Sequence, residues 1–369
     1  MRTSILRLRE AHPRWGPSRI LAGLRREPVL RGLQLPSPAS IGRYLHQWPR
    51  FRRPPKRKAP SSERPQAPTE VHQRWQMDFK MGIPLGDGTL VNMYTVRDPV
   101  GAGSIGAFLF PAGRVGKALQ GVSWEQARQV LRTCFARWGT LPREVQTDWE
   151  SALTGHTPDP FPSLFTLWLQ GLGIQHLKIR RHTPTDNAEV ERCHRTLYEY
   201  AIQGNEEASV AQLQAILDRS VVELNTELPS RAHGCAGKPP TLAHPELLQP
   251  LRPFQPEHEL ALFALKRVDA YLSTFTWKRK VGKTGQVHLG KQRYSVGRPY
   301  ARQQVLVRFS PQERHFVFYE AETEQEIKRL PAKGLDVPDL TGLAPWPVGL
   351  GPQQLPLPLP ASPDGVGFQ

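Results

Sequence analysis

The sequence predicts an α/β fold in which a mixed sheet is flanked by helices. Three strand-like stretches follow one another closely from Val71, and the first two are joined by GDG at 86–88, which is typical of a hairpin turn. From about residue 123 to 228, helical and strand-like segments alternate instead. A meander followed by such alternation favours one sheet with both antiparallel and parallel neighbours, covered by helices.

Residues 1–48 are expected to form short helices. One helix covers Leu6–Ala11, a second begins near Pro17, and Ser37 is a candidate N-cap for a third. Arg43 lies off the apolar stripe of this third helix and could contact DNA. Short helices that end in a polar, basic helix fit a helix-turn-helix DNA reader, and they fit an ordinary helical bundle equally well.

Residues 49–70 have the composition of a linker, because they are rich in Pro and Ser and lack apolar periodicity. Six of the nine residues from 50 to 58 are basic. A charge run of this kind is usually a solvated surface, but beside a candidate DNA reader we expect contacts with phosphate. The residues expected to make these contacts are Arg52, Arg53, Lys56, Arg57 and Lys58.

Residues 71–245 carry the predicted sheet and its helices. The expected strands are RWQMDFKMGI, LVNMYTVRD, SIGAFLF, EVQTD and IQHLKI. The expected helices cover about 123–138, 163–173, 189–204 and 209–228. Ser123 and Gln126 have the spacing of a capping box, and Gly139 is expected to end that helix.

Residues 262–335 are predicted to form a small β-barrel, because short strand-like stretches recur there between Gly, Pro and polar turns. The surface of this region is basic, and we expect Lys278, Arg279 and Lys280 to contact DNA. Residues 345–369 are rich in Pro and are expected to be a disordered tail.

Net charge is the strongest bulk property of the chain. Its 49 Lys and Arg exceed its 33 Asp and Glu, which gives a net charge of +16. Such a field attracts a polyanion, most commonly nucleic acid. No stretch approaches the roughly 18 apolar residues of a membrane span, and three scattered Cys cannot form a disulfide framework. We therefore expect an intracellular protein that binds double-stranded DNA and has no membrane partner.

Three carboxylates stand where a mixed sheet could expose them. Asp78 lies inside an apolar strand, Asp148 ends a strand, and Glu191 is near the start of a helix. Each has an ordinary alternative role in a turn or at a helix terminus, and Asp98 is interpreted as a turn residue. If the three converged, their repulsion would call for Mg²⁺ or Mn²⁺, and a pair of such ions could act on a phosphodiester.

The segments WQMDFK, VQTDWESA and PTDNAEVERCHRTL, in that order, resemble the three signature blocks of DDE transposases and retroviral-type integrases. The resemblance is closest to bacterial insertion-sequence transposases that carry the integrase core, and it extends over about residues 9–335. It implies an RNase H-like core with a five-stranded mixed sheet. It also implies that Asp78, Asp148 and Glu191 ligate two Mg²⁺ (or Mn²⁺) ions in each active site.

The resemblance further implies metal-dependent cleavage at transposon ends, followed by attack of the freed 3′-hydroxyl on target DNA. The partners would be transposon-end and target DNA and at least one further copy of the chain, in the cytoplasm of a bacterium at its nucleoid. Asn187, Arg192 and His194 lie close to Glu191 in the sequence and are expected to contact DNA.

Some positions depart from the family pattern. Trp149 and Glu150 follow Asp148 where Asn-Gly is usual, Ala188 replaces a Gly, and the segment LTGHTPDPFP is an apparent insertion. The matching N-terminal region also begins partway into the one expected, so an upstream domain is expected to be absent or encoded elsewhere. Two alternatives therefore stay open: a catalytically inactive, transposase-derived DNA-binding protein, and another RNase H-like nuclease.

Overall fold

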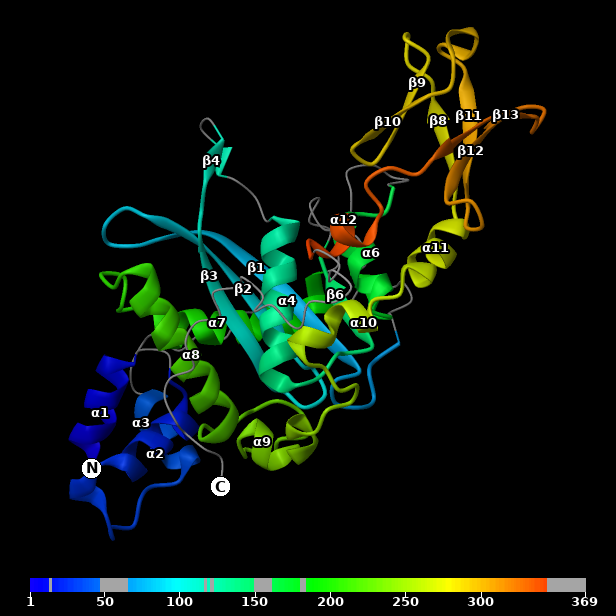
Figure 1. The fold of residues 1–369 in the computed structure, drawn as a ribbon. Helices are drawn as coiled ribbons and strands as arrows, with labels where there is room; N and C mark the ends of the chain where they lie inside the picture. The colour runs from blue at the N-terminus through cyan, green and yellow to red at the C-terminus, as the bar shows by residue number, and fades with distance from the viewer. Residues whose placement is uncertain are drawn as a thin grey trace. The chain divides into compact units, whose positions relative to one another are not determined.

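The fold was analysed in a computed structural model that describes seven stretches of the chain (Figure 1). These stretches are residues 1–12, 15–46, 66–115, 118–119, 123–148, 161–179 and 184–343. Several features predicted from the sequence lie outside the described residues: most of the basic linker, nearly all of the apparent insertion, and the C-terminal tail. The individual residues concerned are Arg52, Arg53, Lys56, Arg57, Lys58, Trp149 and Glu150.

A mixed five-stranded sheet forms the centre of the fold, in the order β3-β2-β1-β6-β7. The strands are β1 (Arg74–Pro84), β2 (Leu90–Arg97), β3 (Ser104–Pro111), β6 (Glu144–Thr147) and β7 (Gln175–Lys178). Strand β2 is antiparallel to both β1 and β3. Gln175 and Ile179 donate their amides to the carbonyls of Arg143 and Thr147, so β6 and β7 advance together and run parallel. The predicted mixed sheet is confirmed.

The turn between β1 and β2 is the predicted hairpin. The Leu85 amide donates to the Thr89 carbonyl at 2.8 Å, and the Gly88 amide donates to the Leu85 carbonyl at 2.9 Å. Gly88 has a φ of 81°, in the left-handed region that glycine adopts without a steric penalty. The pairing that starts at this turn shifts at an irregularity between Lys80 and Ile83, and beyond it Asp78 pairs with Thr95 of β2.

Helices α7 (Ala188–Leu197) and α8 (Val210–Thr226) pack on the sheet, α7 against β1 and β2 and α8 against β3 (Figure 1). Fully buried Met93, Leu197 and Leu213 belong to the core between them. The single helix expected over 189–204 is instead α7 followed by a π-helical turn, η3 (Tyr198–Ile202). This packing places one face of α7 directly beside β1.

Three helices near the N-terminus have a small core of their own: α1 (Arg2–Ala11), α2 (Pro17–Arg26) and α3 (Pro38–His46). The predicted N-cap of α3 is confirmed, since the Ser37 hydroxyl accepts the Ser40 amide at 3.2 Å. Trp15 stacks on His12 at a centroid distance of 3.9 Å and on Tyr200 of η3 at 5.7 Å. The N-terminal helices are therefore joined to the helical stretch that continues α7.

The chain forms two compact units. The first comprises Met1–Gly121, Val145–Asp148 and Ile179–Leu251, and the second comprises Val122–Glu144, Trp149–Lys178 and Arg252–Gln369. The second unit contains α4 (Trp124–Trp138), α6 (Leu164–Gly171), α10 (Glu259–Leu262), α11 (Leu265–Ser273) and α12 (Val337–Thr341). The predicted ends of α4 are confirmed: the Ser123 hydroxyl accepts the Gln126 amide, and Gly139 is left-handed at φ 59°.

The predicted small β-barrel is not confirmed, because the C-terminal strands form two sheets. One has the order β13-β12-β11-β8 and the other pairs β10 with β9. The strands are β8 (Thr276–Lys280), β9 (Gln286–Leu289), β10 (Gln292–Ser295), β11 (Gln304–Ser310), β12 (His315–Glu320) and β13 (Glu326–Pro331). Tyr294 and Trp277 lie 5.3 Å and 6.1 Å from Phe316, so an aromatic core joins the two sheets.

The remaining elements are short. They are η1 (Pro28–Leu30), β4 (Arg114–Val115), β5 (Ala118–Leu119), η2 (Pro184–Asn187), α9 (Pro240–Ala243), η4 (Pro245–Leu248), η5 (Pro256–His258) and η6 (Arg298–Tyr300). Within the stretches that the structure describes, no helix combines the length and the apolar character needed to cross a membrane.

Candidate active site

Asp78 is an acid held in an apolar environment. It lies in the middle of β1, and only 20% of its side chain is exposed. Burial raises the pKa of Asp78 to about 7, and the negative charges of Asp148 and Glu191 add to the shift, against a hydrogen bond from the Phe79 amide. A neighbouring charge has such an effect only at close range. Asp148 and Glu191 therefore lie within electrostatic range of Asp78, on elements that adjoin β1.

Asp148 and Glu191 approach Asp78 from two other elements. Asp148 directly follows β6, which takes its place beside β1 in the sheet, and it is partly buried. Glu191 lies in the first turn of α7, the helix that packs on β1. Burial raises the pKa of Glu191, while the positive charge of Arg195 lowers it. We call these three residues, Asp78, Asp148 and Glu191, the acidic cluster.

The side chains of the acidic cluster do not converge on a single metal position. Among the residues that the structure describes, no three His, Cys, Asp or Glu side chains converge closely enough to hold one metal ion. Its chemistry nevertheless fits a hard cation, because carboxylate oxygens are the ligands that Mg²⁺ and Mn²⁺ prefer. The pKa of Asp78 is raised mainly by burial and further by the charges of Asp148 and Glu191, and a bound cation would oppose both effects.

A buried network of amides joins the three segments that carry the acids. The Gln146 side chain, in β6, donates to the Asp186 carbonyl at 2.8 Å and to the Asn187 side chain at 3.4 Å. Asn187 in turn donates to the carbonyl of Met77, the neighbour of Asp78, at 3.3 Å. These contacts fix β1, β6 and the start of α7 relative to one another, and so they set the spacing of the acidic cluster.

Asn187, for which a DNA contact is predicted, is buried in this structure. The residue is only 2% exposed, and its side chain makes no capping hydrogen bond to α7. It serves instead as the link between α7 and β1. The sequence carried one signal for this network, since Gln146 is a polar residue inside the short strand EVQT, where an amide must find a partner when buried.

His194, for which a DNA contact is also predicted, turns its ring toward Asp78 on β1. His194 is 5% exposed, and its Nδ1 lies 3.6 Å from Oδ2 of Asp78. Neither ring nitrogen has a hydrogen-bond partner within the described part of the chain. Burial, together with the charge of Lys80, lowers the pKa of His194 to about 4, so the ring is neutral at pH 7.

Helical spacing explains why His194 turns inward. Val190, Cys193, His194 and Leu197 are all buried, and they follow the i, i+3, i+4, i+7 pattern of a single helix face. His194 therefore belongs to the core-facing stripe of α7. This periodicity was visible in the sequence and would have placed the ring against the sheet.

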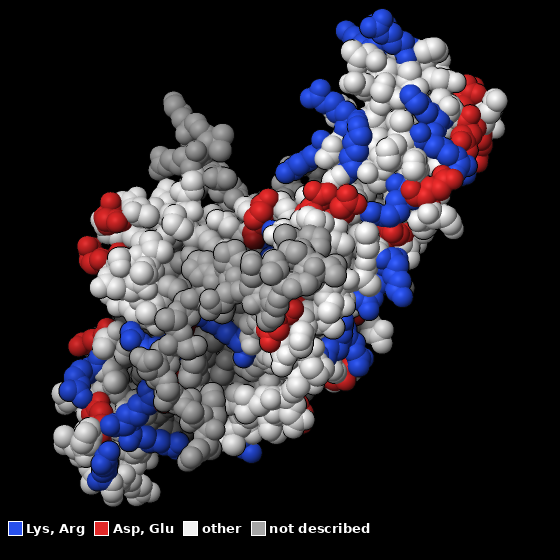
Figure 2. All heavy atoms as spheres, in the orientation of Figure 1, with Lys and Arg blue, Asp and Glu red and all other residues white. Residues whose placement is uncertain are grey.

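The other predicted DNA contacts within the described residues lie at the surface or near it. Arg192 is exposed and forms an ion pair with Glu189, one turn back along α7. Arg43 on α3 is exposed as well, with a side-chain nitrogen 3.5 Å from the Ser40 hydroxyl. Lys278 and Lys280 are exposed on β8, whereas Arg279 is partly buried. Figure 2 shows basic side chains gathered on the N-terminal helices and, separately, on the C-terminal sheets.

One comparison with known proteins matches a part of the chain that carries the site. Residues 172–240 match the family model described as integrase core domain. The matched segment contains Asn187, Glu191 and His194, while Asp78 and Asp148 lie before it. The family match thus concerns the segment that supplies the third acid.

Solved integrase structures are similar at low levels of identity. The catalytic core domain of BIV integrase is 16% identical with a TM-score of 0.31, covering 47% of this chain and 95% of that one. A chain of the simian T-cell lymphotropic virus intasome in complex with PP2A regulatory subunit B56 gamma is 14% identical with a TM-score of 0.36. The match covers 89% of this chain and 97% of that one. The HTLV-2 integrase catalytic core domain in complex with magnesium is 12% identical with a TM-score of 0.33, covering 47% of this chain and 96% of that one. Such scores carry no weight for the activity of this chain.

Proposed function

We propose that this chain is a transposase or integrase with an RNase H-like core, which cleaves DNA ends and joins the freed 3′-hydroxyl to target DNA. The observation that carries the proposal is the placement of three elements: Asp78 lies on β1, Asp148 follows the neighbouring strand β6, and Glu191 lies in the first turn of α7, which packs on β1. The integrase-core match over residues 172–240 and the net charge of +16 support it.

Asp78, Asp148 and Glu191 would hold two Mg²⁺ or Mn²⁺ ions. When bound, such a pair supplies Lewis-acid activation of the attacking oxygen and stabilisation of the leaving oxygen. The carboxylates of the acidic cluster provide the hard oxygen ligands, and the proton held by Asp78 near neutral pH has to leave before that carboxylate can ligate an ion.

The remaining residues of the site keep the acids in place. Asn187 and Gln146 hold the backbones of β1, β6 and α7 at a fixed spacing. The neutral ring of His194 fills the space beside Asp78 and limits the positions open to that carboxylate. Rigid support of this kind matters because small displacements of a ligating group weaken both metal binding and catalysis.

The substrate we propose is double-stranded DNA at the element ends and at the target. Arg43, Arg192, Lys278, Arg279 and Lys280, together with the basic linker residues, are proposed to contact its phosphates. Because two ends must be brought together for transfer, we propose that the active form is a dimer or larger. Its place of action would be the bacterial cytoplasm, at the nucleoid.

The test uses the full chain with DNA carrying the inverted repeats that flank its gene, in Mg²⁺. We expect nicking at the repeat ends by the wild type and at least a thousandfold less with Asp148→Ala. Glu322→Gln, an exposed acid of the C-terminal sheets, is the control that should keep full activity. Nicking that persists unchanged in Asp148→Ala would rule out the assignment.

A second candidate function is sequence-specific DNA binding without catalysis. It is favoured by one observation, namely that no group of three possible ligands converges on a single point among the described side chains. Tight binding to the repeats, with no cleavage or strand transfer in either Mg²⁺ or Mn²⁺, would select this function over the first.

A further inference from the structure

A pocket in the second unit is rich in arginine and lacks acids. It has a volume of about 840 Å³, and its walls include Arg143, Arg252 and Arg267, after which we call it the arginine pocket. No Asp or Glu lines it. The pKa of Arg252 is lowered by burial and by the positive charges of Arg267 and Arg143, so the three cations repel one another.

Two of these guanidinium groups are held in fixed positions. Arg252 donates to the carbonyls of Pro142, Leu172 and Gly173 at 2.7–3.2 Å. Arg267 donates to the carbonyls of Gly171 and Leu262 at 3.0 and 3.1 Å. A methyl group placed on Gly173 would lie 3.4 Å from a nitrogen of each arginine, so those nitrogens are at most about 7 Å apart.

Capping of α6 explains only part of this arrangement. The carbonyls of residues 171–173 close the C-terminal end of α6, where positive side chains are favourable. The helix end supplies roughly half a negative charge, however, whereas the two arginines bring two full positive charges. Of the five N–H donors on each guanidinium, Arg252 uses three and Arg267 uses two in hydrogen bonds to described residues. Charge and donors therefore remain available for an anion.

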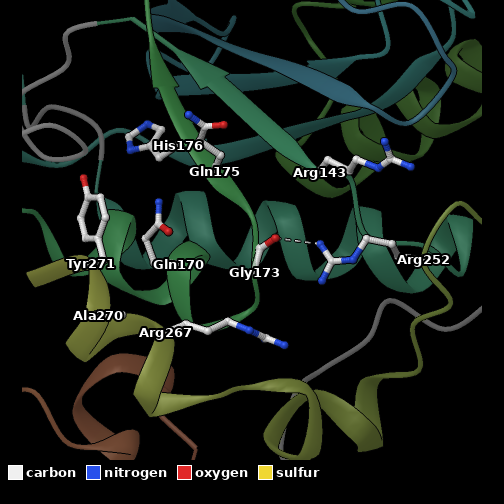
Figure 3. A pocket seen from close by; sticks show the side chains of 9 residues that line it. All are labelled: Arg143, Gln170, Gly173, Gln175, His176, Arg252, Arg267, Ala270 and Tyr271. Carbon is white, nitrogen blue, oxygen red and sulfur yellow. Dashed lines mark hydrogen bonds between the residues drawn. The ribbon is translucent and has the colours of Figure 1, made fainter. Parts of the chain in front are cut away.

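The other end of the pocket is polar and uncharged. Figure 3 shows Gln170, Gln175, His176 and Tyr271 toward the left of the view and Arg143 and Arg252 toward the right, with Arg267 below them. His176 Nδ1 lies 2.9 Å from the Thr166 hydroxyl, and burial lowers the pKa of His176 to about 3, so this ring adds no charge at pH 7. Amide side chains offer both donors and acceptors, as the edges of nucleobases do, and a tyrosine ring can stack on a base.

We propose that the arginine pocket binds one nucleoside phosphate unit, with the phosphate at Arg252 and Arg267 and the base beside Tyr271 and the glutamines. A volume of about 840 Å³ accommodates a ligand of this size, whereas a double helix is too wide to enter. Guanidinium groups match the geometry of phosphate oxygens. The unit is either the end of a DNA strand or a free nucleotide, because both present the same chemistry. The proposal goes beyond end cleavage, since no step of that reaction uses the pocket.

The first experiment measures binding of deoxyadenosine monophosphate to the full chain by titration calorimetry, in EDTA so that catalysis plays no part. We expect saturable binding at least tenfold tighter than that of deoxyadenosine. Arg267→Gln should weaken it tenfold or more, whereas Arg219→Gln, which removes an exposed charge of α8, should not. Equal binding of nucleotide and nucleoside, or equal effects of the two arginine variants, would overturn the proposal.

The two ends of the pocket can be tested separately. Tyr271→Leu should weaken the binding of deoxyadenosine monophosphate but leave the binding of inorganic phosphate unchanged. Tyr271→Phe keeps the ring and should bind the nucleotide as tightly as the wild type does. If inorganic phosphate binds as tightly as the nucleotide, the pocket is not a nucleotide site. The same conclusion holds if hexaglutamate competes for the pocket at a lower concentration than the nucleotide itself.

The source of the nucleotide is decided with two strands of six thymidines, one with a 5′-phosphate and one with a 5′-hydroxyl. A tenfold preference for the phosphorylated strand that disappears in Arg267→Gln assigns the pocket to strand ends. Equal binding of the two strands, beside tight binding of the mononucleotide, assigns it to free nucleotide. Because these measurements contain no metal, failure of the proposed cleavage reaction would leave their result unchanged.

Discussion

The acidic cluster and the arginine pocket are both sites of like charge, but the fold supports them differently. Asp78 stands on a strand in an apolar environment, and its charge is opposed by burial and by two further acids. Arg252 and Arg267 are held by backbone carbonyls, which accept their N–H donors and partly balance their charge. An ionised carboxylate has no donors of its own, so its charge is balanced by an outside cation or removed by a proton. The comparison shows that a like-charge cluster can be fixed rigidly or left to be completed by its ligand.

The largest expected effect is the loss of end cleavage when Glu191 of α7 is changed, compared with the same change at Glu189, two residues earlier. Glu191→Gln removes a proposed metal ligand and should lower end cleavage by about a thousandfold, equivalent to about 4 kcal/mol. Glu189→Gln removes only the exposed ion pair with Arg192 and should stay within about threefold of the wild type. Cleavage assays in Mg²⁺ under single-turnover conditions compare the two. Equal losses in both variants would contradict the assignment of Glu191.

The next effect tests whether burial opposes the charge of Asp78. Its folded-state pKa of about 7 exceeds its ordinary value of 3.8, so the stability it contributes is complete below pH 3.8 and is lost as pH rises through 7. Asp78→Asn should therefore raise the free energy of unfolding by on the order of 2 kcal/mol at pH 8 without metal, and by little at pH 4. Urea unfolding at both pH values measures this, and a variant less stable than the wild type at pH 8 would refute it.

A smaller effect is expected from the amide network. Asn187→Ala removes the side-chain donor to the Met77 carbonyl and one of the two acceptors of the Gln146 side chain, which should cost about 1 to 3 kcal/mol. Gln203→Ala, at an exposed position after η3, is the control and should change stability by less than about 0.5 kcal/mol. Urea unfolding at pH 7 compares the two. If both variants matched the wild type, the network would not hold the three segments together.

The smallest effect separates the two sites by the ions they take. Inorganic phosphate at ten times its dissociation constant should stabilise the wild type by about 1.4 kcal/mol, compared with chloride at equal ionic strength. Arg267→Gln should abolish the stabilisation by phosphate and keep the stabilisation by Mg²⁺. Asp148→Ala should abolish the stabilisation by Mg²⁺ and keep the stabilisation by phosphate. Thermal unfolding measures all four combinations. A phosphate increment that survives in Arg267→Gln would remove the basis for a fixed arginine site.

The sequence predicted elements with local signals better than it predicted contacts made over long distances. Alternating strands, the glycine turn at 86–88, and the caps at Ser37 and Ser123 are confirmed because turn and cap chemistry act within a few residues. Strand β8, with the sequence TWKRK, was missed because Trp277 is its only buried residue. The small β-barrel is not confirmed for a related reason, since the pairing of distant strands into one sheet or two is a tertiary property.

The candidate site was found in part for the same reason. Asp78, Asp148 and Glu191 lie in recognisable sequence blocks, and their mutual influence follows from the fold. Asn187 and His194 were assigned to DNA because their polarity was considered without the faces on which they lie. The arginine pocket had no sequence signal, because residues 143, 252 and 267 share no motif and meet only through tertiary packing.

The acidic cluster consists of residues 78, 148 and 191, and the buried network of amides at Asn187 is needed to hold them. A chain still on the ribosome has no complete site until α7 has left the exit tunnel and docked on β1. Under the proposed function, a fragment that ends before residue 188 would lack Glu191 and could not cleave DNA. Cleavage would then depend on synthesis at least through the end of α7.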